Sequence, residues 1–172
     1  MTALYTASWR ALWEASKAGP LPVQPVRVSR GRPKFWLAAF PAVEELMPPG
    51  WMFNSTDREK NERGYRHQLD RIGLERISAR LDEIAAEHDG APLALACFET
   101  DRGGCHRSWA ASWLCEQTGV AVPELSVLRG REGAVQLVFE VEPPERSGQN
   151  TCIDTSGRQL QLATAAGAAE GQ

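Results

Sequence analysis

The segment Leu93-Ala-Leu-Ala-Cys-Phe98 constrains the fold more than any other part of this 172-residue chain. It is apolar at six consecutive positions, follows the stop signal Asp89-Gly90-Ala-Pro92, and leads into a polar turn that contains glycine. A strand that is apolar on both faces is typical of a central parallel strand covered by helices. The segment therefore predicts an α/β protein with this strand in the middle of its sheet.

Shorter strands and helices alternate around this segment. We predict further strands at 3–8, 23–28, 120–125 and 134–141, and helices at 9–17, 42–47, 57–88 and 106–117. Gly73 is expected to divide the long helix, and Pro25 makes its strand a short or edge strand. The alternation predicts a small three-layer α/β domain with a mainly parallel sheet.

Composition separates a folded part from a tail. Residues 1–142 are expected to form a single α/β domain, whereas residues 143–172 are low in large apolar residues and are expected to be disordered. A net charge of −3 gives no overall attraction to nucleic acid or to an anionic membrane. No stretch reaches the ~20 apolar residues of a membrane span, and no signal peptide is evident. We therefore expect a cytoplasmic protein with reduced thiols, and the oligomeric state stays open.

The residues best suited to catalysis lie in the turn and the helix start that follow the apolar strand. Cys97 and Glu99 are two positions apart, so a persisting strand would project them to the same side. Cys105 stands at a helix start, where the helix dipole and Arg107 would lower the pKa of its thiol. His106 is the residue type suited to proton transfer near neutral pH. We predict four catalytic residues: Cys105, His106, Glu99 and Cys97.

A cationic turn follows the second predicted strand. Four cations in it have no acid among them: Arg27, Arg30, Arg32 and Lys34. A right-handed crossover would bring this turn, and the hydroxyls that end the first strand, to the same sheet edge as the cysteines. Cations, hydroxyls, a carboxylate and a thiol at one edge suit a phosphate-containing small molecule or nucleic acid. The predicted ligand-binding residues are Arg107, Ser8, Thr6, Arg27 and Arg32.

Known motifs narrow the chemistry. A Cys-x5-Arg phosphatase loop is excluded because Gly103 and Ala111 stand six places after Cys97 and Cys105. No Walker loop or Gly-x-Gly-x-x-Gly motif is present, so no nucleotide cofactor is predicted. A zinc site would use both cysteines and His106, but Cys-x7-Cys-His lacks the usual paired spacings and shows no fourth ligand. No metal is predicted either.

Several of these segments resemble one known family. Cys97-Phe-Glu99 and Cys105-His-Arg-Ser108 resemble the Cys-x-Glu and Cys-His-Arg signature of the domain of unknown function 488. Tyr5-Thr-Ala-Ser8 is similar to the first strand of that family, and Val26-Arg-Val28 with Gly31-Arg-Pro-Lys-Phe35 is similar to its second strand and turn. The likeness covers about residues 4–125 and looks most like a divergent actinobacterial or phage member. It implies a Rossmann-like α/β domain and names no reaction.

Two classes of function fit these residues. The first is an enzyme acting on a nucleotide, a nucleic-acid base or another phosphorylated ligand, with Cys105 as nucleophile or redox thiol. Glu99 and His106 would then transfer protons, while Arg107, with Arg27 and Arg32, would bind the anion. The alternative is a non-catalytic module that binds a ligand or nucleic acid. A reversible disulfide between Cys105 and Cys97, or a purely structural Cys97, also stays open.

Overall fold

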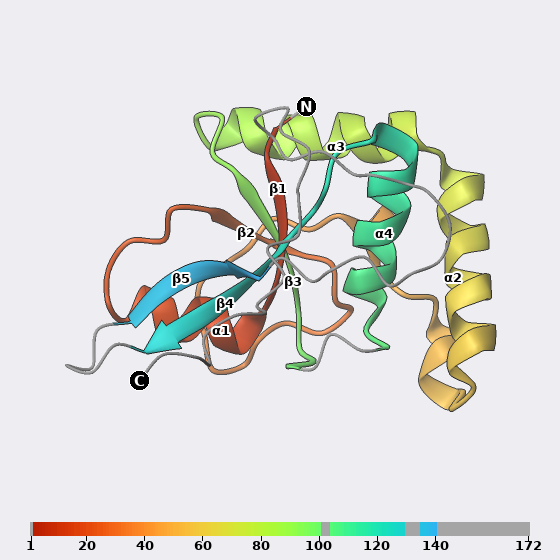
Figure 1. The fold of residues 1–172 in the computed structure, drawn as a ribbon, viewed down its shortest axis with the longest axis horizontal. Coiled ribbons are helices and arrows are strands. Elements are labelled where there is room, and N and C mark those ends of the chain that lie inside the picture. Colours follow the sequence, from red (N-terminus) through yellow and green to blue (C-terminus); the bar gives the residue numbers. More distant parts are fainter. Residues whose placement is uncertain (1, 101–103, 130–134, 141–172) are drawn as a thin grey trace, which may run out of the picture.

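The chain folds around a five-stranded mixed sheet (Figure 1). The computed structural model describes residues 2–100, 104–129 and 135–140, so the predicted tail lies outside the described residues. The strands follow the order β2-β3-β1-β4-β5: β1 (Leu4–Ser8), β2 (Gln24–Arg27), β3 (Leu93–Cys97), β4 (Glu124–Arg129) and β5 (Val135–Glu140). The first four are parallel, and β5 runs antiparallel to β4. The predicted α/β class and mainly parallel sheet are confirmed.

Helices of very different lengths connect the strands. The α-helices are α1 (Trp9–Ser16), α2 (Arg58–Ile72), α3 (Leu74–Glu87) and α4 (His106–Thr118), and two 3-10 helices are η1 (Glu44–Leu46) and η2 (Gly50–Asn54). The helix predicted at 42–47 is wrong in length, because a parallel bridge from Arg27 holds Ala42 in extended backbone. The strand predicted at 120–125 starts only at Glu124 and continues into a pairing with β5. Within the described residues no helix is long and apolar enough to cross a membrane.

Both faces of the sheet carry a hydrophobic core. All five residues of β3 are buried, as the continuous apolar run predicts. Leu93 and Leu95 belong to a cluster that includes residues of α2, α3 and α4. Ala94 and Ala96 belong to a second cluster with Trp9 of α1. Successive side chains of a strand point to opposite faces, so the two clusters cover the two sides of the central strand.

The connections after β1 and β3 leave the sheet in opposite directions. The connection from β1 to β2 contains α1 and crosses over β3. The connection from β3 to β4 contains α4 and crosses over β1 in the opposite direction. Ser8 and Cys97, the last residues of these two adjacent parallel strands, are register partners. In open α/β sheets a crevice forms where neighbouring connections diverge, and ligands bind there at the carboxyl ends of the strands. This edge is therefore the place to look for a functional site.

Gly73 separates α2 from α3, as predicted. Its backbone has φ 83° and ψ 150°, a region essentially confined to glycine, and a Cβ there would meet no heavy atom within 4 Å. Gly73→Ala should therefore lower the free energy of unfolding by about 1–3 kcal/mol through backbone strain alone, measured by urea denaturation. Gly50→Ala is the matched control, since its Cβ also meets nothing within 4 Å and its φ is not positive. Equal losses in both variants would contradict this account.

Candidate functional site

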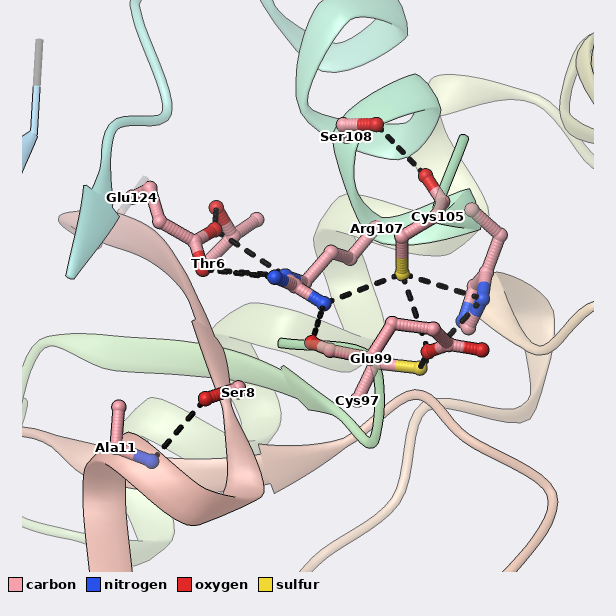
Figure 2. Close-up of polar contacts among 10 residues, drawn as sticks. Thr6, Ser8, Ala11, Cys97, Glu99, Cys105, Arg107, Ser108 and Glu124 are labelled. Carbon is pink, nitrogen blue, oxygen red and sulfur yellow. Dashed lines mark hydrogen bonds and ion pairs between the residues drawn. The ribbon is translucent and has the colours of Figure 1, made fainter. Parts of the chain in front are cut away.

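Polar and sulfur-bearing side chains gather where β1 and β3 end and α4 begins (Figure 2). Cys97 is the last residue of β3, and Cys105 is the N-cap of α4. Gly104, with φ 94°, turns the chain into the helix. His106 and Arg107 form the first turn of α4, so both side chains start at the carboxyl edge of the sheet. Local sequence alone therefore places most of the predicted catalytic residues together.

Two thiols, an imidazole and a carboxylate share one small volume. The Cys97 thiol donates to Oε2 of Glu99 at 2.5 Å, and Cys105 Sγ lies 3.3 Å from the same oxygen. His106 Nδ1 lies 3.7 Å from Cys97 Sγ and 4.0 Å from Cys105 Sγ. His106 Nε2 lies 3.0 Å from the Val28 carbonyl oxygen, which only accepts, so the proton belongs on Nε2. In the neutral imidazole the Nδ1 lone pair then faces the two sulfur atoms.

A buried ion pair supports this cluster from the side of β4. Arg107 is 0% exposed, and its Nε and Nη2 donate to the Glu124 carboxylate at 3.0–3.2 Å. The Thr6 hydroxyl donates to the other side of that carboxylate at 2.5 Å. Nη1 of Arg107 donates to the Glu99 backbone carbonyl at 2.5 Å and to Cys105 Sγ at 3.2 Å. Nε, Nη1 and Nη2 of Arg107 therefore each have an acceptor inside the protein, and the anion-binding role of Arg107 stays a prediction.

The pKa values of the two thiols shift in opposite directions. The hydrogen bond from Cys97 lowers the pKa of the Cys105 thiol to about 6, assisted by His106 and Arg107 and opposed by burial. The same contact, together with burial, raises the pKa of Cys97 far above its ordinary value. Cys97 therefore holds its proton between Glu99 and the Cys105 thiolate. At neutral pH the pair is one thiolate and one thiol.

Glu99 is the exposed member of the cluster, whereas Cys97, Cys105 and His106 are buried. Burial would raise the pKa of Glu99, but the hydrogen bond from Cys97 and the contacts with Cys105 and His106 lower it instead. The carboxylate is therefore ionised at neutral pH. Since its side chain is the one that meets solvent, we expect the cluster to be approached from the side of Glu99.

Two more of the predicted ligand-binding residues, Ser8 and Arg27, have other partners. The Ser8 hydroxyl accepts from the Ala11 amide at 3.1 Å and caps α1. Arg27 Nη1 donates to the carbonyls of Ser29 and Arg30 at 3.0 and 3.1 Å, which braces the cationic turn. Arg32 is exposed in that turn. None of these contacts joins the thiol cluster, so only the location of the turn links it to the cysteines.

Two buried residues of the site were not anticipated. Glu124 carries a signal that could have found it, because an acid at the start of an apolar strand needs a buried partner. Tyr65 of α2 donates its hydroxyl to the Leu46 carbonyl at 2.7 Å, and its ring centroid lies 5.8 Å from that of His106. Burial, and then the charges of Cys105 and Cys97, raise the pKa of Tyr65. Tyr65 is therefore an uncharged side chain that packs against His106. It was not anticipated because its position in an amphipathic helix is that of an ordinary core residue.

Comparisons with known proteins transfer no residue roles to this chain. No family model, no curated protein and no solved structure matches it. The resemblance of the segment 97–108 to the domain of unknown function 488 stays a prediction. The chemistry therefore follows from the groups themselves: a thiolate that serves as nucleophile or metal ligand, an imidazole that carries protons or binds metal, and a carboxylate.

Proposed function

We propose that the protein is an enzyme that uses the Cys105 thiolate as a nucleophile toward a phosphate-containing ligand of the nucleotide or nucleobase kind. The observation that carries this proposal is the set of groups around Cys105 Sγ. Arg107 Nη1 lies 3.2 Å from the sulfur and His106 Nδ1 lies 4.0 Å from it, and the sulfur stands at the N-terminus of α4. A cation, an imidazole and a helix N-terminus each favour a thiolate.

The broader assignments form part of the same proposal. The two hydrophobic clusters on opposite sides of β3 support a Rossmann-like, three-layer domain. The Cys-x-Glu and Cys-His-Arg segments support membership of the domain of unknown function 488 family. The chemistry needs Cys97 and Cys105 as free thiols, which is how they occur in the structure. A cytoplasmic location would keep them reduced.

In the proposed reaction, each residue of the cluster has a distinct task. The Cys105 sulfur gives an electron pair to the electrophilic atom of the ligand, and the bond from that atom to the leaving group breaks. The leaving group keeps the bonding pair and takes a proton from Nδ1 of His106, which has to carry a second ring proton for this step. Cys97 hydrogen-bonds the thiolate before attack, and Arg107, held by Glu124, positions it. Glu99 then removes a proton from a water molecule, whose oxygen bonds to the same atom of the ligand. The bond to sulfur breaks, its electron pair returns to Cys105 as the thiolate, and the proton on Glu99 passes to His106.

The ligand class is supported by the surface next to the cluster. Arg30, Arg32 and Lys34 are exposed in the turn after β2. This turn packs against Phe98, since a Cβ added at Gly31 would lie 3.1 Å from Phe98 Cε2. Phe98 lies between Cys97 and Glu99 in the sequence, and it is 43% exposed. Cations can bind a phosphate group, and an aromatic ring can stack on a base. The two together suit a nucleotide-like ligand.

The pH dependence of alkylation tests the nucleophile. Metal-free, reduced protein would be treated with iodoacetamide at a series of pH values, and modification of Cys105 would be quantified by peptide mass spectrometry. We expect a midpoint near pH 6, because the pKa of this thiol is lowered to about 6, against roughly 8.5 for a free cysteine. The midpoint is the useful readout, since a lower pKa also weakens each thiolate as a nucleophile and leaves the rate at pH 7 little changed.

Two substitutions of Cys97 make this experiment specific. Cys97→Ser keeps a hydrogen-bond donor beside Cys105 and should keep the low midpoint. Cys97→Ala removes the donor and should raise the midpoint, because this hydrogen bond is the largest cause of the lowered pKa. An ordinary midpoint in the unaltered protein, or a Cys105 that reacts only after unfolding in urea, would reject the nucleophile.

A non-catalytic binding module is the second candidate. It is favoured by the burial of both thiols, since Cys97 is 2% and Cys105 3% exposed. In that case the cluster would stabilise the sheet edge, and the cationic turn with Phe98 would bind the ligand alone. A thiol that is silent to iodoacetamide in the folded protein would select this function over the enzyme.

A further inference from the structure

We infer that Cys97, Cys105, His106 and Glu99 form a binding site for a divalent transition metal ion of the zinc type. Their four candidate ligand atoms are two Sγ, one Nδ1 and one carboxylate oxygen, and all lie within 4.8 Å of one another. The inference goes beyond the proposed function and does not depend on it. The sequence alone predicted no metal, because the spacing of the cysteines and His106 showed no fourth ligand. The inference revises that prediction, with Glu99 as the fourth ligand.

The ligand set selects the kind of metal. Thiolate and imidazole ligands favour zinc and other borderline or soft ions, whereas magnesium and calcium prefer oxygen ligands alone. Two sulfurs, one nitrogen and one carboxylate oxygen fill the four positions that zinc takes in closed sites. Three of the four ligands are buried, and Glu99 alone is exposed. An ion would therefore enter past Glu99, and the carboxylate would close the site behind it.

The distances between the ligand atoms already approach those of a tetrahedron. Zinc bonds of about 2.3 Å to sulfur and about 2.0–2.2 Å to nitrogen or oxygen place neighbouring ligand atoms roughly 3.3–3.8 Å apart. His106 Nδ1 lies 3.7 and 4.0 Å from the two sulfurs, and Cys105 Sγ lies 3.3 Å from Glu99 Oε2. Among these four contacts, the one between Cys97 and Glu99 is the exception at 2.5 Å, and the other two separations are within 4.8 Å. That contact is a hydrogen bond whose proton the metal would replace, and exposed Glu99 is the partner that can move.

The groups behind the ligands are those that metal sites require. Histidine ligands donate their second ring N–H to an acceptor, which orients the ring. The Nε2 proton of His106 goes to the Val28 carbonyl at 3.0 Å, which leaves Nδ1 free to ligate. Arg107 Nη1 lies 3.2 Å from Cys105 Sγ and would stabilise that thiolate. Arg107 is itself fixed by Glu124, so both sulfur and nitrogen ligands are held before any metal arrives.

Metal binding and thiol reactivity would compete, because both use Cys105 Sγ. A thiolate bound to zinc has less electron density to give to an electrophile. Bound metal would therefore slow reaction at the proposed nucleophile, and removal of metal would restore it. This predicts a regulatory role for the ion if the thiol proves reactive, and a structural role if it does not.

The experiment uses the full chain, reduced with a phosphine, stripped with a chelator and then desalted. Zinc binding would be measured by competition with a chromophoric chelator, and Co²⁺ would report the ligands through its absorption spectrum. We expect one equivalent of metal and a cobalt spectrum with thiolate charge-transfer bands and the intense visible bands of tetrahedral coordination. Loss of a residue that only supports a ligand weakens metal binding by about 10–100-fold. Loss of a ligand itself should have a larger effect, and we expect this for each of Cys97→Ser, Cys105→Ser and His106→Ala.

Two further variants keep the result interpretable. Glu99→Ala alters an exposed residue, so it should fold normally, and it should weaken zinc binding while retaining the thiolate bands of cobalt. His67→Ala removes an exposed histidine outside the cluster and should change nothing. The inference is overturned if metal binds with the pale spectrum of oxygen coordination, if binding survives both cysteine substitutions, or if the unaltered protein does not compete with the chelator.

The outcome separates this inference from the proposed function. Tight zinc binding with an ordinary alkylation midpoint for metal-free Cys105 would support the metal site and reject the nucleophile. A midpoint near 6 without zinc binding would do the reverse. If both hold, one equivalent of zinc should protect Cys105 from iodoacetamide, and chelator should restore its alkylation.

Discussion

Replacing Glu124 with alanine should lower the free energy of unfolding by about 3–5 kcal/mol. The substitution leaves the Arg107 guanidinium, which is 0% exposed, without its carboxylate, and it leaves the Thr6 hydroxyl without its acceptor. An uncompensated charge in the interior costs far more than the net value of the pair that it came from. Urea denaturation followed by tryptophan fluorescence measures the loss.

Two variants isolate the effect of burial. Glu83→Ala breaks an exposed ion pair with Arg80 on α3 and should cost no more than about 1 kcal/mol. The double variant Arg107→Met with Glu124→Leu removes both charges and should recover part of the loss, because apolar groups can replace a buried pair. If Glu124→Ala is no more damaging than Glu83→Ala, the pair does not stabilise the site as described.

The stability of the metal-free protein should rise by about 3 kcal/mol between pH 6 and pH 9 through Cys105 alone. Its thiol has a pKa of about 6 in the folded protein and an ordinary value of 9.0. For an acid whose pKa is lowered by folding, the stabilisation is complete above the unfolded value and is lost as the pH falls through the folded value. Above pH 9 stability should decline again, because unfolded Cys97 ionises while folded Cys97, with its raised pKa, keeps its proton.

The measurement compares the unaltered protein with Cys105→Ser at each pH. Below pH 9 Cys97 stays protonated in both folded proteins, because burial and Glu99 raise the pKa of its thiol even without Cys105. Groups that do not contact Cys105 titrate alike in both, so the difference in unfolding free energy over this range isolates the Cys105 thiol. This difference should grow as the pH rises from 6 to 9. A difference that is constant with pH would mean that Cys105 is not ionised in the folded protein, and it would also weaken the case for a nucleophile.

The fold was largely predictable because its strongest signals are local. The apolar run Leu93–Cys97 has the burial of a central strand, and Gly73 divides two amphipathic helices as expected. The errors lie where a proline-rich segment gives weak periodicity. Residues 42–47 contain only a 3-10 turn, and β4 starts beyond Pro123, which fixes its own φ and lacks an amide proton.

The sequence by itself determined which groups meet at the candidate site when those groups are neighbours in the chain. Cys97, Glu99, Cys105 and His106 lie within one strand–turn–helix unit, and the geometry of that unit brings their side chains together. Only the tertiary structure decided what surrounds them. The order of the strands puts β4 next to β1, and this brings the Glu124 carboxylate within hydrogen-bond distance of Arg107. Val28, which orients the imidazole, is 78 residues from His106.

The same tertiary contacts gave new partners to residues that the sequence had already singled out. Arg107 was expected to bind an external anion, and the structure buries it beside Glu124 with its Nη1 3.2 Å from Cys105 Sγ. Glu99 was expected to transfer protons, and its distance from both sulfurs also makes it the fourth metal ligand. Residue type and spacing specify which chemistry is possible. Burial and long-range partners decide which charges persist, because a charge in the interior survives only beside its partner.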